Sequence, residues 1–405
     1  MRVDYGQTVH GQEEIDAVVE VLQTSTQMGP RVPKMQARVA ALFDKAHGIM
    51  VNSGSSANYL AVKILDLPKG SEVITPALTF ATTVAPLIRH GLIPAFVDAE
   101  EGTYNIDVSK IEAMITDKTS ALMIPSLIGN LPDWKAIRAL ADKYGLRVIE
   151  DSADTLGATM KGRSTGRYSD VSTTSFCGSH VIKGAGNGGM LCVNDPELAR
   201  KAVLLRAWGR SSSLFGDSEI IDNLFNVKLD GIEYNTTFDF ETLGYNLELA
   251  EVSAAFGLVQ LDKLDLHISE REKNFASHLT FFKDYEDWFV LPRQLPDSRT
   301  GWLSFPLTLR DDVPFTRRAL QMFVEKADIQ TRPVFTGNIL RQPAMKDVEH
   351  RTDAGGYPVS DAVMRSGILL ACHHGLTDAH VAYVHEQFEA FAAQHQNRSA
   401  THMAA

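Results

Sequence analysis

Cysteine is scarce in this chain of 405 residues, which contains only Cys177, Cys192 and Cys372. Their separations fit neither a zinc-binding pattern nor the dense spacing of a secreted disulfide scaffold. Three thiols also cannot supply the four ligands of an iron–sulfur cluster. The sequence therefore predicts no metal site, no iron–sulfur cluster and a reducing, cytoplasmic location.

The chain also lacks a long apolar run and an excess of positive charge. No uninterrupted apolar segment approaches the roughly 18 residues that span a bilayer, and no basic-then-apolar leader opens the sequence. The 39 basic and 50 acidic residues give a formal net charge of −11, whereas nucleic acids and anionic membranes require a basic surface. We therefore expect no nucleic-acid or membrane partner, while a phosphate-bearing small molecule can still bind through backbone amides.

Apolar residues are abundant, at 44 % of the chain, and the length exceeds that of one usual domain, so we expect two lobes. From His47 to Glu150, short β-branched runs alternate with helical stretches, which is typical of βαβ units in a mainly parallel sheet. After Phe275 the pattern changes to that of a smaller α+β lobe. The predicted organisation is an N-terminal arm (1–30), a large domain (31–262), a small C-terminal domain (263–396) and a disordered tail (397–405).

Polar residues gather where the predicted strands end, and ligands of such sheets bind beyond the carboxyl ends of the strands. The sequence Asn52-Ser-Gly-Ser-Ser-Ala-Asn58 follows one strand and opens a helix, which suits a phosphate site and equally an ordinary serine N-cap. The sequence Glu150-Asp-Ser-Ala-Asp154 ends another strand. A buried carboxylate there needs a charged or hydrogen-bonded partner, unless the aspartate simply caps the next helix.

The loop from Ser172 to Met190 carries one histidine, one lysine and five glycines. His180 has a reference pKa of about 6.5 that suits proton transfer, although a lone histidine is more often structural. Lys183 competes with it, because an amine can form a Schiff base with a carbonyl group and an imidazole cannot do so stably. Both residues remain candidates at this point.

Two further polar loops are Gly244-Tyr-Asn-Leu-Glu248 and Arg332-Pro-Val-Phe-Thr-Gly-Asn338, which are either ligand contacts or ordinary turns. Taken with the loops above, they resemble the DegT/DnrJ/EryC1/StrS family of sugar aminotransferases and dehydratases. The resemblance extends from the N-terminal arm to the His373-His374 loop. It implies an α/β enzyme of fold type I, similar to aspartate aminotransferase, with a large mainly parallel-sheet domain, a smaller C-terminal α+β domain and pyridoxal phosphate as cofactor.

The resemblance also implies which residues bind the cofactor. Gly54, Ser55, Ser56 and Ser175 hold its phosphate, Phe80 stacks on its pyridine ring, Asp151 pairs with its ring nitrogen, and Asp154 belongs to the same site. In this family the Gly-Tyr-Asn loop reaches a neighbouring subunit's cofactor, so Asn246 implies a homodimer with shared active sites. The expected substrate contacts are Arg332, Asn338, His373 and His374, each of which also has a structural interpretation.

The family's Schiff-base lysine lies five residues after the serine of the Ser-Phe pair, and His180 stands at that position. Lys183 is three residues further along. Histidine here marks the sugar 3-dehydratase branch, which includes the colitose-pathway and ascarylose-pathway enzymes, and Asp154 agrees because the aminotransferases usually have glutamine there. The ascarylose-type enzyme carries an iron–sulfur cluster on cysteines that residues 207–214 lack.

By this resemblance the chain is a lyase of deoxysugar biosynthesis, as in lipopolysaccharide O-antigen. It removes the C3 hydroxyl of a nucleotide-linked 4-keto-6-deoxyhexose, with pyridoxal or pyridoxamine phosphate bound non-covalently and His180 as the base. Glutamate regenerates the amine form. Two alternatives stay open: an aminotransferase that uses Lys183, and a catalytically silent relative that binds a nucleotide sugar. The sequence departs from the family at Asn187, where a glutamate is usual.

Overall fold

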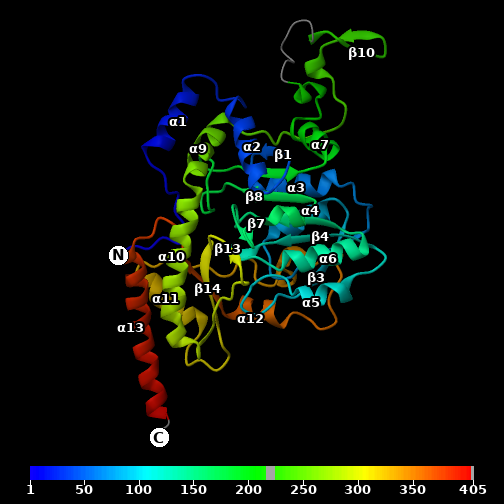
Figure 1. The fold of residues 1–405 in the computed structure, drawn as a ribbon. Coiled ribbons are helices and arrows are strands. Elements are labelled where there is room, and N and C mark those ends of the chain that lie inside the picture. Colours follow the sequence, from blue (N-terminus) through cyan, green and yellow to red (C-terminus); the bar gives the residue numbers. More distant parts are fainter. Residues whose placement is uncertain (216–223, 403–405) are drawn as a thin grey trace.

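The computed structural model describes residues 1–215 and 224–402, and its central feature is a seven-stranded sheet (Figure 1). In order across the sheet the strands are β1 (His47–Val51), β9 (Gly189–Val193), β8 (Val171–Ser175), β5 (Arg147–Asp151), β4 (Thr119–Pro125), β2 (Glu72–Pro76) and β3 (Ile93–Val97). Strand β9 is antiparallel to β1 and β8, and the other neighbouring pairs are parallel. The predicted α/β class with a mainly parallel sheet is confirmed.

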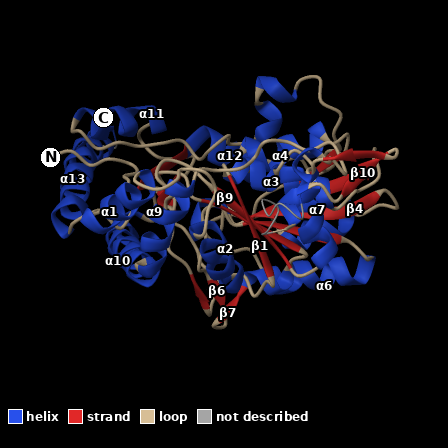
Figure 2. Ribbon diagram, turned by 90° about the horizontal axis from the view of Figure 1, so that it is seen from above, coloured by secondary structure: helices blue, strands red, loops and turns tan. Residues whose placement is uncertain are grey.

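Helices cover both faces of the sheet, as the view from above shows (Figure 2). Successive side chains of a strand point to opposite faces, so Ile49 and Val51 pack with one helix layer and Met50 with the other. The first layer includes α3 (Gly54–Ile64), α4 (Ala81–Arg89) and α7 (Pro196–Arg206). The second includes α2 (Arg31–Leu42), α5 (Val108–Ile111) and α6 (Trp134–Tyr144).

Local sequence signals define where these helices begin and end. Ser53 caps α3, because its hydroxyl accepts a hydrogen bond from the Ser56 amide at 3.1 Å. Asp133 caps α6 in the same way, and Gly145 ends that helix in the left-handed conformation with φ = 67°. The start of α3 is therefore fixed beside the end of β1.

The N-terminal arm packs back on the large domain through α1 (Gln12–Leu22) and α9 (Glu251–Asp262). Glu14 is fully buried between them, where it accepts hydrogen bonds from Gln260 and Lys263 at 2.8 Å. The 19-residue helix α10 (Leu264–Phe282) then leads into the C-terminal part of the chain. The predicted domain boundary at residue 262 lies between these two helices.

The C-terminal domain is built on an antiparallel sheet of β12 (Phe289–Val290), β14 (Ser304–Leu309) and β15 (Gly367–Ala371). Helices α10, α11 (Arg317–Lys326), α12 (Pro358–Ser366) and α13 (Asp378–His402) surround it (Figure 1). Its core is rich in stacked aromatic rings, such as Phe275 on Trp302 with ring centres 4.4 Å apart. Helix α13 continues to His402, so the predicted tail is helical up to that residue, and residues 403–405 lie outside the described part.

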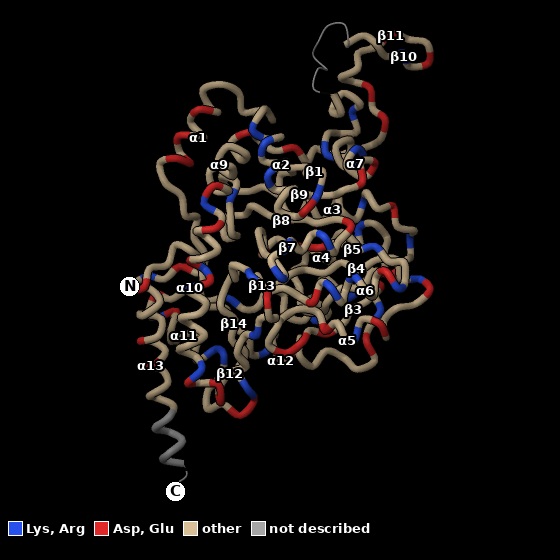
Figure 3. Tube along the Cα trace, in the orientation of Figure 1, with Lys and Arg blue, Asp and Glu red and all other residues tan. Residues whose placement is uncertain are grey.

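Smaller elements complete the fold. A three-stranded sheet of β13 (Ser298–Arg299), β6 (Thr159–Met160) and β7 (Arg163–Ser164) joins the two domains, and β10 (Val227–Leu229) with β11 (Ile232–Tyr234) forms a projecting hairpin (Figure 1). Lys, Arg, Asp and Glu are interspersed along the trace (Figure 3). Among the described residues, no helix has both the length and the apolar character needed to cross a membrane.

The two domains approach closely at the short 3-10 helix Leu127–Gly129 that follows β4. Gly129 has φ = 88°, and a Cβ atom there would lie 2.5 Å from the amide nitrogen of Leu303. The preceding residue, Ile128, is a fully buried β-branched residue with φ = 61°. Such a backbone conformation costs of the order of 1–3 kcal/mol, so the surrounding packing must hold it in place.

We expect Gly129→Ala to lower the free energy of unfolding by about 2–4 kcal/mol, because it adds both left-handed strain and a backbone overlap. Gly145→Ala is the matched control. Gly145 has a similar φ of 67° but no atom within 4 Å of its Cβ position, so it should lose only about 1 kcal/mol. Denaturant titration of both variants measures the difference, and equal losses would contradict the close approach.

Candidate active site

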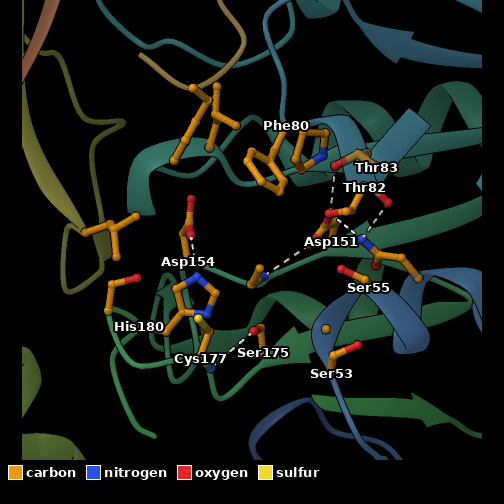
Figure 4. Close-up of a pocket in the computed structure, with 18 of the residues that line it drawn as sticks. Ser53, Ser55, Phe80, Thr82, Thr83, Asp151, Asp154, Ser175, Cys177 and His180 are labelled. Carbon is orange, nitrogen blue, oxygen red and sulfur yellow. Dashed lines mark hydrogen bonds and ion pairs between the residues drawn. The ribbon is translucent and has the colours of Figure 1, made fainter. Parts of the chain in front are cut away.

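A cavity of about 340 Å³ lies at the carboxyl ends of the parallel strands. The loops after β1, β2, β4, β5 and β8 converge there because parallel strands end at one edge of a sheet. The N-terminal arm and the C-terminal domain close the remaining sides with Tyr5, Leu303 and Phe335. Figure 4 shows His180 and Asp154 at one end of the cavity, with Ser53 and Ser55 at the other.

The end of the cavity near Ser53 and Ser55 has the features of an anion site. Ser53, Gly54 and Ser55 at the start of α3 line it, and a helix N-terminus carries partial positive charge. Gly54 lies so close to β8 that a Cβ atom would be 2.5 Å from the Ser175 Cβ atom. Gly54, Ser55 and Ser175 line the cavity, whereas Ser56 does not and instead donates its hydroxyl to Asn52 Oδ1 at 2.6 Å.

Asp151 lies deep in the cavity wall at the last position of β5. Its Oδ2 atom accepts hydrogen bonds from Asn58 Nδ2 at 2.7 Å and from Thr83 Oγ1 at 2.8 Å. These donors are neutral, and burial raises the pKa of the Asp151 carboxyl. Its ionised form would therefore be stabilised by a cationic partner in the cavity.

His180, which is partly buried, and Asp154, which is buried, form an acid–imidazole pair with Nε2 and Oδ1 3.6 Å apart. The other oxygen of Asp154 accepts the Ile128 amide at 3.0 Å. Burial, with a smaller effect of Asp151, raises the pKa of Asp154 to about 7, and burial lowers the pKa of His180 to about 4. Near neutral pH the imidazole is thus an uncharged base beside an acid that can hold a proton.

Lys183 lies in the same loop but its side chain does not line the cavity. It is fully buried, with its Nζ atom 3.0 Å from His374 Nε2. Burial lowers the pKa of Lys183 to about 7. Among the described residues, no lysine lines the cavity.

Of the predicted cofactor-binding residues Phe80 and Asn246, only Phe80 lines the cavity. Phe80 is about half exposed at the cavity, 5.9 Å from Phe335 in an edge-to-face arrangement. Asn246 is exposed, pairs with Ala207 and does not line the cavity of its own chain.

The four predicted substrate contacts do not line the cavity. Asn338 is buried and bonds Asp361, and His373 is buried against the Asp4 carbonyl oxygen. His374 contacts Arg271 and Lys183. Arg332 is exposed and stacks on the ring of Tyr5, a residue of the cavity wall, at 5.3 Å.

Sequence reasoning missed several residues of the wall. Asn58 lies within the Ser-Gly-Ser-Ser-Ala-Asn sequence and Phe335 within the Arg-Pro-Val-Phe sequence, so those patterns carried a signal that could have identified both. Tyr5 and Leu303 reach the cavity from segments far away in the chain. Nothing in their own neighbourhoods in the sequence marks them.

Comparison with known proteins relates the whole chain to one group. The DegT/DnrJ/EryC1/StrS aminotransferase family matches residues 9–389. The lipopolysaccharide biosynthesis protein RfbH of Salmonella typhimurium is 36 % identical over 85 % of this chain and 81 % of its own. The dTDP-4-dehydro-2,6-dideoxy-D-glucose 3-dehydratase of Saccharopolyspora spinosa is 34 % identical over 96 % and 86 %. GDP-perosamine synthase of Caulobacter vibrioides is 28 % identical over 91 % and 92 %.

Solved structures agree with the sequence matches. GDP-4-keto-6-deoxymannose-3-dehydratase with bound GDP-perosamine has a TM-score of 0.87 at 27 % identity, over 95 % of this chain and all of the other. The same enzyme from E. coli with bound hydrated PLP has a TM-score of 0.86 at 27 % identity, over 96 % and 100 %. A third structure, with a trapped PLP-glutamate geminal diamine, has a TM-score of 0.86 at 26 % identity, over 95 % and 100 %.

The raised pKa of Asp154 predicts how Asp154→Asn changes stability with pH. The folded carboxyl titrates near 7 and the unfolded one near 4, so the stability linked to its protonated form is present at low pH and is lost as the pH rises through about 7. We expect the variant to melt at a higher temperature than the parent at pH 8.5, with a much smaller difference at pH 5. Differential scanning calorimetry measures both.

Asp133→Asn is the control, because Asp133 is an exposed N-cap that asparagine replaces well. Its effect on the melting temperature should be small at both pH values. If Asp154→Asn gave no more stabilisation at pH 8.5 than at pH 5, the buried carboxyl would not be responsible.

Proposed function

Because the chain belongs to the DegT/DnrJ/EryC1/StrS aminotransferase family, we propose that it is a 3-dehydratase that acts on a nucleotide-linked 4-keto-6-deoxyhexose. The observation that carries the proposal is His180, which lines the cavity where the resemblance expects the family's lysine, while Lys183 does not line it. Pyridoxal phosphate is the cofactor of this family of nucleotide-sugar enzymes. Deoxysugar biosynthesis, as for lipopolysaccharide, is the proposed setting.

The residues of the cavity fit this cofactor. The phosphate would bind at the α3 N-terminus with Gly54, Ser55 and Ser175, and the half-exposed ring of Phe80 offers a stacking face. The buried carboxyl of Asp151 would gain the cationic partner it lacks from a protonated ring nitrogen. When bound, the amine form of the cofactor supplies an amine for the sugar's keto group and an aromatic ring that delocalises negative charge.

His180 is the proposed base. With its pKa lowered to about 4, the imidazole is neutral and can take up a proton at Nε2. Asp154 Oδ1 lies 3.6 Å from that atom and stabilises the protonated ring. The same Nε2 atom can then return the proton to the departing C3 hydroxyl of the sugar. Without a lysine at the site, the cofactor would be held non-covalently and regenerated by glutamate.

We assign no substrate contact to Asn338, His373 or His374, because other parts of the chain use their polar atoms. Arg332 remains a proposed contact for an anionic group, since it is exposed and stacks on Tyr5 at the cavity wall. Cys177, Cys192 and Cys372 are all free thiols, which supports the proposed location in the reducing cytoplasm.

We also propose a homodimer in which Asn246 reaches the partner's site. The segment before Asn246 exposes large apolar side chains, including Ile232 at 65 % and Leu243 at 90 %, and a second copy would cover them. Light scattering of the purified protein is expected to give twice the mass of one chain. A single-chain mass at micromolar concentration would contradict shared sites.

The proposed reaction predicts the behaviour of His180→Asn. We expect the parent enzyme, with pyridoxal phosphate, glutamate and a 4-keto-6-deoxy nucleotide sugar, to give a 3-deoxy product. The variant should lose at least about 10²-fold in kcat, because general base catalysis contributes about 10²–10⁴-fold, while still binding the cofactor. Product mass and absorbance of the bound cofactor check the two expectations.

Lys183→Met is the matched control from the same loop, and it also tests the rival aminotransferase, whose family includes GDP-perosamine synthase. Methionine fills the volume of the buried lysine stem without an amine. The dehydratase should keep most of its activity, and borohydride should trap no cofactor on Lys183 in the parent. An amino sugar formed without loss of water, or trapping on Lys183, would favour the rival, whereas cofactor binding without turnover would favour a silent relative.

A further inference from the structure

Arg271 lies in the middle of α10 and is fully buried, with no carboxylate within ion-pair distance among the described residues. A buried charge is costly unless its polar atoms are satisfied. All five N–H groups of the guanidinium find acceptors. Nε donates to His374 Nδ1, and the two terminal nitrogens donate to four backbone carbonyl oxygens.

The four carbonyl oxygens come from two segments that both contribute residues to the cavity wall. Nη2 donates to Ser179 and His180, at 3.3 and 3.2 Å. Nη1 donates to Trp302 and Leu303, at 3.0 and 3.2 Å. Because His180 and Leu303 both line the cavity, one planar cation joins two of its walls.

These bonds are part of a closed ring of contacts that includes Asp154. The Leu303 amide donates to the Ile128 carbonyl oxygen at 2.9 Å, and the Ile128 amide donates to Asp154. Asp154 faces His180, whose carbonyl oxygen returns the chain to Arg271. The separation of the imidazole and the carboxyl is thus held from both sides through one guanidinium.

The hydrogen bonds around Arg271 also indicate the protonation states of His374 and Lys183. Arginine only donates, so His374 Nδ1 accepts and a neutral His374 carries its proton on Nε2. That proton points at Lys183 Nζ, 3.0 Å away, which can accept it only as an uncharged amine. The pKa of Lys183, lowered to about 7 by burial and by Arg271, agrees. Arg271 is therefore the cation that the carbonyl oxygens face.

We propose that Arg271 is a positioning residue, which holds His180 at its working distance from Asp154 by tying the His180 loop to the Trp302–Leu303 backbone. The inference rests on the proposed role of His180 as base. Lysine cannot replace the guanidinium, because its three donors on one nitrogen cannot span four carbonyl oxygens from two segments.

The test is Arg271→Lys in the purified holoenzyme. We expect kcat to fall at least about 10-fold with KM changed less than about 3-fold, since the base is misplaced while the residues at the other end of the cavity keep their positions. In hydrogen–deuterium exchange, peptides that cover residues 176–188 should exchange at least about 10-fold faster. Unchanged kcat together with unchanged exchange would overturn the proposal.

Arg206→Lys is the control for the general cost of changing a buried arginine. Arg206 is 5 % exposed and donates to Gln36 and to the Met50 carbonyl oxygen, away from the cavity. It should lose stability while keeping kcat and the exchange of residues 176–188. An equal fall in kcat for both variants would show that destabilisation alone explains the loss, and would reject a positioning role.

Two further results keep the test decisive. If Arg271→Lys does not fold, His374→Asn, which changes the acceptor of Nε, should show the same two effects at smaller size. Unchanged kcat and unchanged exchange in that variant would reject the proposal.

Hydrogen–deuterium exchange can be measured without substrate. If the parent makes an amino sugar, the proposed function fails, while the exchange of residues 176–188 still decides whether Arg271 holds the loop.

Discussion

Two adjacent carboxylates, Glu150 and Asp151, are buried at the end of β5, and the site depends on how each is neutralised. Strand geometry turns them to opposite faces. Glu150 accepts hydrogen bonds from the hydroxyls of Ser152 and Ser172, so it is satisfied within the protein. Lys45 lies close enough to Glu150 for the two charges to attract, whereas the groups that bond Asp151 are all neutral, so the demand of Asp151 for positive charge is directed into the cavity. This unmet demand supports the proposal that a cationic ring binds in the cavity.

The fold and the main loops of the site could be predicted from the sequence because both depend on local order along the chain. Alternating strands and helices imply a parallel sheet, and a parallel sheet brings the loops after β1, β5 and β8 to one edge. His180 and Asp154 were predicted as site residues from the resemblance to the family, whose motifs lie within such loops. The position of His180, five residues after Ser175, carried that prediction without any distant contact.

The contributions that sequence reasoning missed come from long-range packing. Arg271 lies on a helix that starts more than eighty residues after His180, and its sequence neighbours give no sign of a buried cation. Asn338 and His373 were predicted as substrate contacts, and that role stays a prediction. The structure uses both to satisfy nearby backbone and side-chain groups. Such choices depend on which segments meet, which a one-dimensional pattern does not state.

The left-handed backbone of Ile128 links the stability of the fold to the geometry of the site at a single position. Glycine there would relieve a steric cost of roughly 1–2 kcal/mol, but it would remove a side chain that packs in the aromatic core. It would also make the backbone more flexible at the amide that donates to Asp154. Truncating a buried isoleucine costs about 2–5 kcal/mol, which exceeds the strain that glycine would relieve. Stability and the position of the Asp154 carboxyl therefore favour the same strained residue at position 128.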